Sequence, residues 1–134
     1  MEKFKSIDEV REYFSGDKFA TEAAGIEIVE AGVQYAKCRF RVEDVHLNAA
    51  NVVMGGAIYT LADLTFAVAA NSEGVHTVTA SSNISFLAPA TGKELYAEAK
   101  PIKEGRTICL YEVRVYDEND RNVAYATMTG AHVG

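Results

Sequence analysis

The stretch Gly56-Ala-Ile-Tyr-Thr-Leu-Ala-Asp-Leu-Thr-Phe-Ala-Val-Ala-Ala70 contains one charged side chain, that of Asp63. Asp63 is also the only Asp, Glu, Lys or Arg between Asp44 and Glu73. Burying a lone carboxylate costs roughly several kcal/mol unless a partner compensates for it. The stretch therefore predicts that Asp63 is either a satisfied structural group or a group with a chemical role.

The same stretch predicts a buried helix that Gly55 and Gly56 open and that runs to about Asn71. Its other faces are also largely apolar, as in helices buried on most sides. Residues 49–70 are long enough to cross a bilayer, but a central Asp63 and the glycine pair argue for burial inside protein. One stripe at helical spacing should face the core: Ile58, Leu61, Ala62, Thr65, Val68 and Ala69.

Elements of two kinds flank this helix. Ser6-Ile-Asp-Glu9 reads as a capping box, and a second short helix is expected from Asp17 to Gly25, so residues 1–24 form an N-terminal helical cover. Alternation with a period of two indicates strands, in the segments 26–31, 33–42, 76–87, 93–103, 107–116 and 121–133. The order predicts one α+β domain over residues 1–134, with an antiparallel sheet covered by one central helix.

Composition excludes several classes of function. The chain has 134 residues and a net charge of -6, so it should not attract nucleic acid or anionic membranes. The N-terminus lacks the apolar core of a signal peptide, and Cys38 and Cys109 lie in apolar runs, so a reducing cytoplasm is expected. No Cys or His stands at ligand spacing, so we expect neither a metal site nor a cofactor.

Long strands with a single main helix leave one sheet face and the sheet edges under-covered. Pairing of subunits would solve both problems. A homodimer or homotetramer is therefore expected.

Three groups near the helix are candidates for chemistry, each with a structural alternative. The free first-turn amides at Gly55-Gly56 could hold an oxyanion, or the pair could be a tight turn. Asp63 could act as general base or nucleophile, or it could be hydrogen-bonded across a subunit contact. In His46-Leu47-Asn48 the Asn could orient a carbonyl or water, or its side chain could satisfy the loop.

Together these residues resemble a known family. His46-x-Asn48, Met54-Gly55-Gly56 and Leu61-Ala62-Asp63 are similar to the H-x-N-x-x-G-x-x-H-G-G and L-A-D motifs of hotdog-fold thioesterases of the phenylacetate-degradation (PaaI-like) group. The resemblance covers about residues 20–133. It also includes Asn83 to Ala90, Lys103 to Arg106 and the end of the last strand.

The resemblance implies a hotdog fold and hydrolysis of an acyl-coenzyme A thioester at a subunit interface, with coenzyme A as part of the substrate. Asp63 would be general base or nucleophile, the Gly55 amide would bind the thioester oxygen, and Asn48 and Thr79 would assist. The substrate would also meet His46, Met54, Gly56, Phe86, Pro89, Lys103, Gly105, Arg106 and Thr107.

Two positions depart from the family pattern. Met54 stands where the family has His, and Asn51 stands where it has Gly. Met cannot donate the hydrogen bond of an imidazole, although the Gly55 amide is unaffected. The alternative function is therefore a non-catalytic acyl-CoA-binding hotdog protein.

Overall fold

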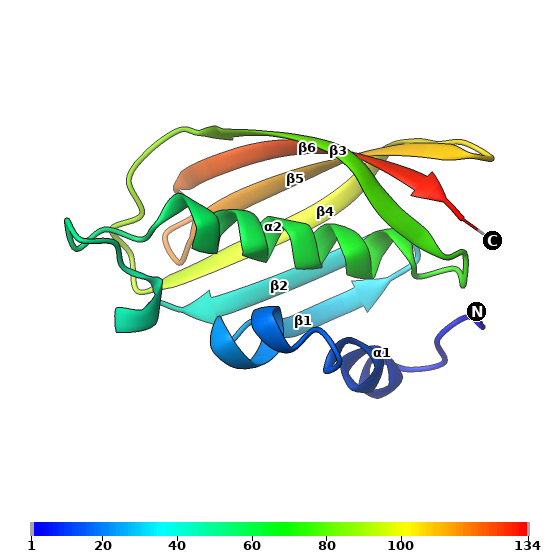
Figure 1. The fold of residues 1–134 in the computed structure, drawn as a ribbon, viewed down its shortest axis with the longest axis horizontal. Helices are drawn as coiled ribbons and strands as arrows, with labels where there is room; N and C mark the ends of the chain where they lie inside the picture. The colour runs from blue at the N-terminus through cyan, green and yellow to red at the C-terminus, as the bar shows by residue number, and fades with distance from the viewer. Residues whose placement is uncertain (1, 134) are drawn as a thin grey trace.

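The computed structural model describes residues 2–133. Six strands form one antiparallel sheet in the order β1-β2-β4-β5-β6-β3, and Figure 1 shows the long helix α2 lying across one face of it. The expected α+β architecture is confirmed. In the part of the chain described, no helix has the length and hydropathy needed to cross a membrane. In chain order, the elements are α1 (Ile7–Phe14), η1 (Phe19–Ala23), β1 (Glu27–Gly32), β2 (Tyr35–Arg41), η2 (Asp44–His46), α2 (Gly55–Ala70), β3 (Thr77–Phe86), β4 (Glu94–Glu104), β5 (Ile108–Asp117) and β6 (Asn122–His132).

Helix α2 packs its predicted apolar stripe against the sheet. Leu61 and Ala62 are fully buried, and the buried Thr65 hydroxyl donates to the Leu61 carbonyl at 2.6 Å. The other stripe residues are buried as well, so this prediction is confirmed. The opposite side of α2 is less covered than the sequence suggested, because a narrow open stripe runs along it. That stripe consists of the exposed or half-buried residues Gly56, Tyr59, Thr60, Asp63 and Ala67.

The first helix begins with a modified capping box. The Ser6 hydroxyl accepts from the Glu9 amide at 3.2 Å, as predicted. The Glu9 carboxylate, however, accepts from the Lys5 amide at 2.6 Å, where a standard box would use the amide of the cap residue. Both bonds still satisfy free amides at the helix start.

Helix α1 protects one edge of the sheet. Val10 and Phe14 are its buried residues. The Arg11 guanidinium donates to the Ile28 carbonyl of β1 through Nε at 3.0 Å and through Nη2 at 2.8 Å. Because β1 is an edge strand, this contact occupies a carbonyl that another strand could otherwise pair with.

The other edge strand, β3, has no such protection. Residues 78–83 are all exposed, although successive side chains of a strand point to opposite faces. The strand Thr-Val-Thr-Ala-Ser-Ser-Asn-Ile-Ser-Phe also contains no charge and no proline. An uncharged, exposed edge is suited to pairing with another strand.

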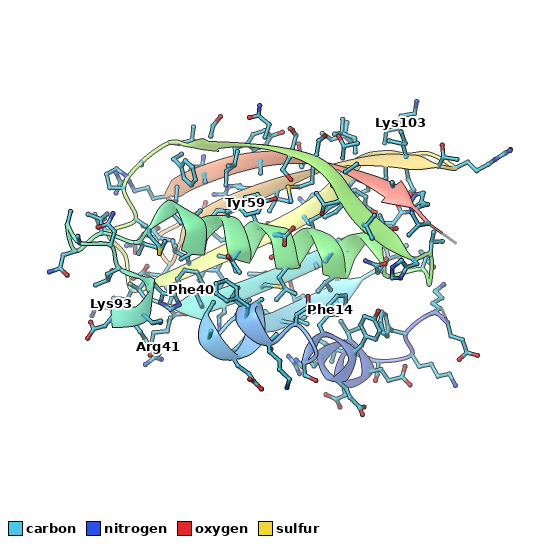
Figure 2. All side chains as sticks on the ribbon, viewed as in Figure 1. Phe14, Phe40, Arg41, Tyr59, Lys93 and Lys103 are labelled. Atoms are coloured by element: carbon cyan, nitrogen blue, oxygen red, sulfur yellow. The ribbon has the colours of Figure 1, made fainter. Side chains whose placement is uncertain are left out.

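The two ends of the molecule carry different parts of the predicted site. Helix α2 begins at the end where β3 finishes and β4 starts (Figure 1). In Figure 2, Lys93, beside the start of β4, and Lys103, close to its end, lie at opposite ends of the sheet. The turn of residues 103–107 is therefore remote from the first turn of α2 in the same chain.

Close packing at Gly130 in β6 gives a test of the core. A Cβ on Gly130 would lie 2.8 Å from Cys109 Sγ and 2.9 Å from Phe66 Cζ. Gly130→Ala should therefore lower the free energy of unfolding by about 1–3 kcal/mol in urea denaturation, the usual cost of overpacking. Gly32→Ala is the matched control, because nothing lies within 4 Å of its Cβ. Equal stability losses in the two variants would contradict the packing.

Candidate active site

The first turn of α2 leaves two amides free. Met54 is the N-cap, and its side chain makes no capping hydrogen bond. Its carbonyl accepts from the Ala57 and Ile58 amides, at 3.1 and 3.3 Å. Among residues 2–133, nothing accepts from the amides of Gly55 and Gly56. Exposed amides at a helix N-terminus can bind a negatively charged or polarised oxygen.

The glycine at position 55 packs closely against an aromatic neighbour. A Cβ on Gly55 would stand 3.2 Å from Cζ of Phe86, at the end of β3. Phe86 is 53% exposed, so its ring covers the helix start from the side of the open edge. The structure thus brings Gly55 and Phe86 together, two residues far apart in sequence.

The side-chain oxygen of Asn48 accepts hydrogen bonds from backbone amides of its own loop. Its Oδ1 accepts from the Ala50 amide at 2.9 Å and from the Val52 amide at 3.2 Å. This is the structural alternative considered from sequence. The Nδ2 group is not used in these bonds, and it can still donate to a carbonyl or a water.

His46 is fixed inside the fold. It is 3% exposed and stacks on Phe40 with ring centroids 4.0 Å apart. Its Nδ1 accepts from the Glu43 amide at 2.9 Å, and its Nε2 is 2.7 Å from the Ala24 carbonyl, so Nε2 carries the proton. Both ring nitrogens of His46 are therefore engaged by the backbone. His46 anchors η1 to the loop before α2.

Asp63 lies on the open stripe with its carboxylate half-buried. Burial raises its pKa above the ordinary value of 3.8, and the carboxylate of Asp17 raises it further. The hydroxyl of Thr79 in β3 lowers the pKa in part, by donating toward the charged form. The structure thus pairs Asp63 with the predicted Thr79. It also adds Asp17, which lacks a sequence signal because its approach to α2 depends on tertiary packing.

An apolar hollow of about 440 Å³ lies beside the first turns of α2. Gly56, Ala57 and Thr60 form its helix side, and Met54 projects along it with 42% of its surface exposed. A Cβ on Gly56 would lie 3.2 Å from Met54 Cε, so the thioether rests against the helix start. The remaining lining residues are Phe19, Ala23, Ala24, Val45 and His46.

Not all predicted site residues meet in one chain. Pro89 follows the end of β3, and its carbonyl accepts from the Arg121 guanidinium at 3.4 Å. The exposed Lys103, Arg106 and Thr107 belong to the β4–β5 turn at the other end of the sheet, together with Gly105. Sequence reasoning missed Tyr59, whose hydroxyl is 2.8 Å from Ser82 Oγ and links the open stripe to β3.

Comparison with known proteins gives consistent results. A model of the Thioesterase superfamily matches residues 50–124. A protein of Archaeoglobus fulgidus, named only provisionally as an esterase, is 34% identical over 128 residues, which are 95% of this chain and 83% of that protein. The acyl-coenzyme A thioesterase PaaI of Escherichia coli is 31% identical over 104 residues, covering 77% of this chain and 74% of PaaI.

Solved structures share the fold. The E. coli PaaI protein superposes with a TM-score of 0.84 and 25% identity, covering 96% of this chain and 97% of that one. A hypothetical thioesterase of Streptococcus pneumoniae with coenzyme A gives 0.82 at 27% identity, covering 90% and 97%. The expected hotdog fold is confirmed. Variants of the Streptococcus protein replace by alanine an Asp and a Thr sixteen residues apart, the separation of Asp63 and Thr79 here.

The environment of Asp63 predicts a specific dependence of stability on pH. Because the folded-state pKa is raised, its contribution is fully present below 3.8 and is lost as pH rises through the folded-state value. Asp63→Asn removes the charge, so the variant should gain stability relative to wild type over that interval, as measured by urea unfolding at a series of pH values. Asp8→Asn, at an exposed position of α1, should lack this gain. Curves for Asp63→Asn and wild type that stay parallel would contradict the desolvation of Asp63.

Proposed function

Because the chain belongs to the thioesterase superfamily, we propose that it hydrolyses an acyl-coenzyme A thioester to a free acid and coenzyme A. The observation that carries the proposal is the desolvated Asp63 carboxylate beside the Thr79 hydroxyl. The names of the E. coli relative and of the coenzyme A-bound Streptococcus neighbour support this substrate class.

Asp63 is suited to activating water or attacking the thioester itself. A carboxylate with a raised pKa is a stronger base than an ordinary carboxylate. As general base it takes a proton from water while the water oxygen bonds to the carbonyl carbon. As nucleophile it forms an anhydride that water then cleaves. In both routes the C–S bond breaks and the sulfur leaves as the thiolate of coenzyme A, which then takes up a proton.

The first turn of α2 supplies the complementary charge. The carbonyl oxygen becomes negative when the carbon is attacked, and the free Gly55 amide at the positive end of α2 would stabilise this charge. The free amide group of Asn48 is a second donor in the loop before α2. The Met54 side chain does not compete with the substrate oxygen for these amides, because it makes no capping hydrogen bond.

The acyl group fits the hollow beside these amides. Its lining is mostly apolar, with Met54 along one wall and Phe19 of η1, 71% exposed, along another. A thioether is flexible and apolar, so Met54 suits an alkyl or aryl group. Imidazole at this position would instead present a polar group.

We propose further that the complete site needs two copies of the chain. The β4–β5 turn, with Lys103 and Arg106, lies at the wrong end of the sheet to reach the Gly55 of its own chain. Antiparallel pairing of two β3 edges brings Thr77 of one copy near Phe86 of the other, since the strand spans these residues. In this pair, the β4–β5 turn of the partner subunit and the partner's Asp63 approach the first turn of α2. Lys103 and Arg106 are suited to the phosphates of coenzyme A.

Loss of Asp63 tests the chemistry. Asp63→Asn should reduce kcat by about 10²- to 10⁴-fold, the usual contribution of a general base, in an assay of thiol release from short, long and aryl acyl-CoAs. Asp8→Asn is the matched control and should keep wild-type turnover. Wild-type-like turnover in folded Asp63→Asn would remove Asp63 from the mechanism.

The same panel separates hydrolysis from binding alone. A non-catalytic acyl-CoA-binding protein would bind members of the panel, as measured by calorimetry, without releasing thiol from any of them. Thiol release by wild type that depends on Asp63 excludes this alternative.

A charge in the middle of β3 tests the two-copy site. Ser81 is exposed near the centre of the strand, so Ser81→Lys would place two like charges close together in an antiparallel pair, which destabilises pairing. Sedimentation should shift toward the monomer, and thiol release should fall with the oligomer fraction. Glu12→Lys, on the exposed side of α1, should change neither. Full activity in a monomeric Ser81→Lys variant would overturn the shared site.

A further inference from the structure

A second cluster of reactive side chains lies at the end of the sheet that carries the β4–β5 turn. Glu104 ends β4, Cys109 is near the start of β5, and His132 ends β6. The sheet register aligns Glu104 with Cys109 and Cys109 with Gly130, two residues before His132 on the same face. One ligand atom from each of the three side chains lies within 4.8 Å of the other two.

We propose that Glu104, Cys109 and His132 form a binding site for a thiophilic divalent cation such as Zn²⁺. Sulfur, imidazole nitrogen and carboxylate oxygen are the donor set that Zn²⁺ takes in proteins. Tetrahedral coordination at the usual bond lengths separates such donors by about 3.3–3.6 Å. His132 Nε2 and Glu104 Oε1 are now in hydrogen-bond contact, so a bound cation would move these two atoms apart. The Cys109 sulfur lies within 4.8 Å of the other two ligand atoms.

Each ligand already has a partner that orients it. His132 Nδ1 is 2.8 Å from Thr77 Oγ1, and Tyr111 donates to Glu104 Oε2 at 2.9 Å. The Gly130 backbone hydrogen-bonds to the Cys109 sulfur. Such outer contacts fix the ring orientation and ligand direction at metal sites. Gly130 also makes the room, because a Cβ there would lie 2.8 Å from Cys109 Sγ.

The site is shielded but reachable. Cys109 is 1% exposed, and the His132 side chain is 8% exposed. The Glu104 side chain is 27% exposed, so solvent reaches the cluster at this residue. Three protein ligands leave a fourth position for water on that side.

Binding rearranges protons in a defined way. His132 Nε2 now hydrogen-bonds Glu104 Oε1. On coordination Nε2 gives its lone pair to the cation, and the ring proton resides on Nδ1, where it can be donated to Thr77. The Cys109 thiol releases its proton to solvent, so uptake of the cation should liberate at least one proton.

Cobalt(II) is the probe for this site in the metal-stripped, full-length protein. Titration should produce the near-ultraviolet thiolate-to-cobalt band and the visible bands of a tetrahedral complex, and Zn²⁺ should displace both. Cys109→Ala should abolish the thiolate band. Cys38→Ala, which removes the other buried cysteine, should retain it.

The orienting contact gives an independent measurement. Tyr111→Phe removes only the hydroxyl that holds Glu104, and it should weaken Zn²⁺ affinity about 10- to 100-fold. Circular dichroism of every variant should match that of the wild type, which controls for loss of the fold. Absence of a thiolate band in folded wild type, or its persistence in Cys109→Ala, would overturn the metal site. The three residues would then form only a hydrogen-bonded cluster.

Discussion

The packing of α2 against the sheet is the constraint on which the rest of the molecule depends. Leu61, Ala62 and Thr65 fill the face of the helix that meets the strands, so rotation about the helix axis is fixed. With that rotation set, only one stripe remains open, and Asp63 must lie on it. The carboxylate therefore keeps access to a substrate while the neighbouring helix and strand remove much of its water. A fully buried or fully exposed position would provide only one of these conditions.

The two edges of the sheet differ in how far the rest of the chain covers them. Arg11 of α1 engages the Ile28 carbonyl of β1, whereas among residues 2–133 no comparable contact covers the free edge of β3. In Figure 1, η1 lies on the β1 side of α2, and β3 lies on the other side. The open stripe lies between them, because Tyr59 bonds to Ser82 of β3 and Thr60 lines the hollow with residues of η1. Pairing at β3 would thus remove an exposed edge and enclose the stripe in one step. Stability and assembly of the proposed site would then depend on the same contact.

Sequence periodicity predicted the helices and strands, but it did not predict which residues would surround the candidate site. Strand alternation and the stripe of α2 follow from local burial, and both agree with the structure to within a few residues. Asp63 stood out because a single charge in an apolar run is a local signal. Its neighbour Asp17 and the remoteness of Lys103 from Gly55 depend on tertiary placement. The proposed metal site was also not visible in the sequence, because Cys109 and His132 do not stand at the spacing typical of metal ligands. The strand register brings them together instead.

Met54 departs from the family motif and still leaves the first-turn amides of α2 free. A Ser, Thr or Asp at an N-cap would accept from an amide of the first turn and so compete with a substrate oxygen. Met54 caps with its backbone carbonyl only, which bonds to the Ala57 and Ile58 amides and leaves those of Gly55 and Gly56 free. Its side chain instead adds to the wall of the apolar hollow. In the proposed site, the change from imidazole to thioether would therefore alter the wall of the hollow and leave the amides beside it unchanged.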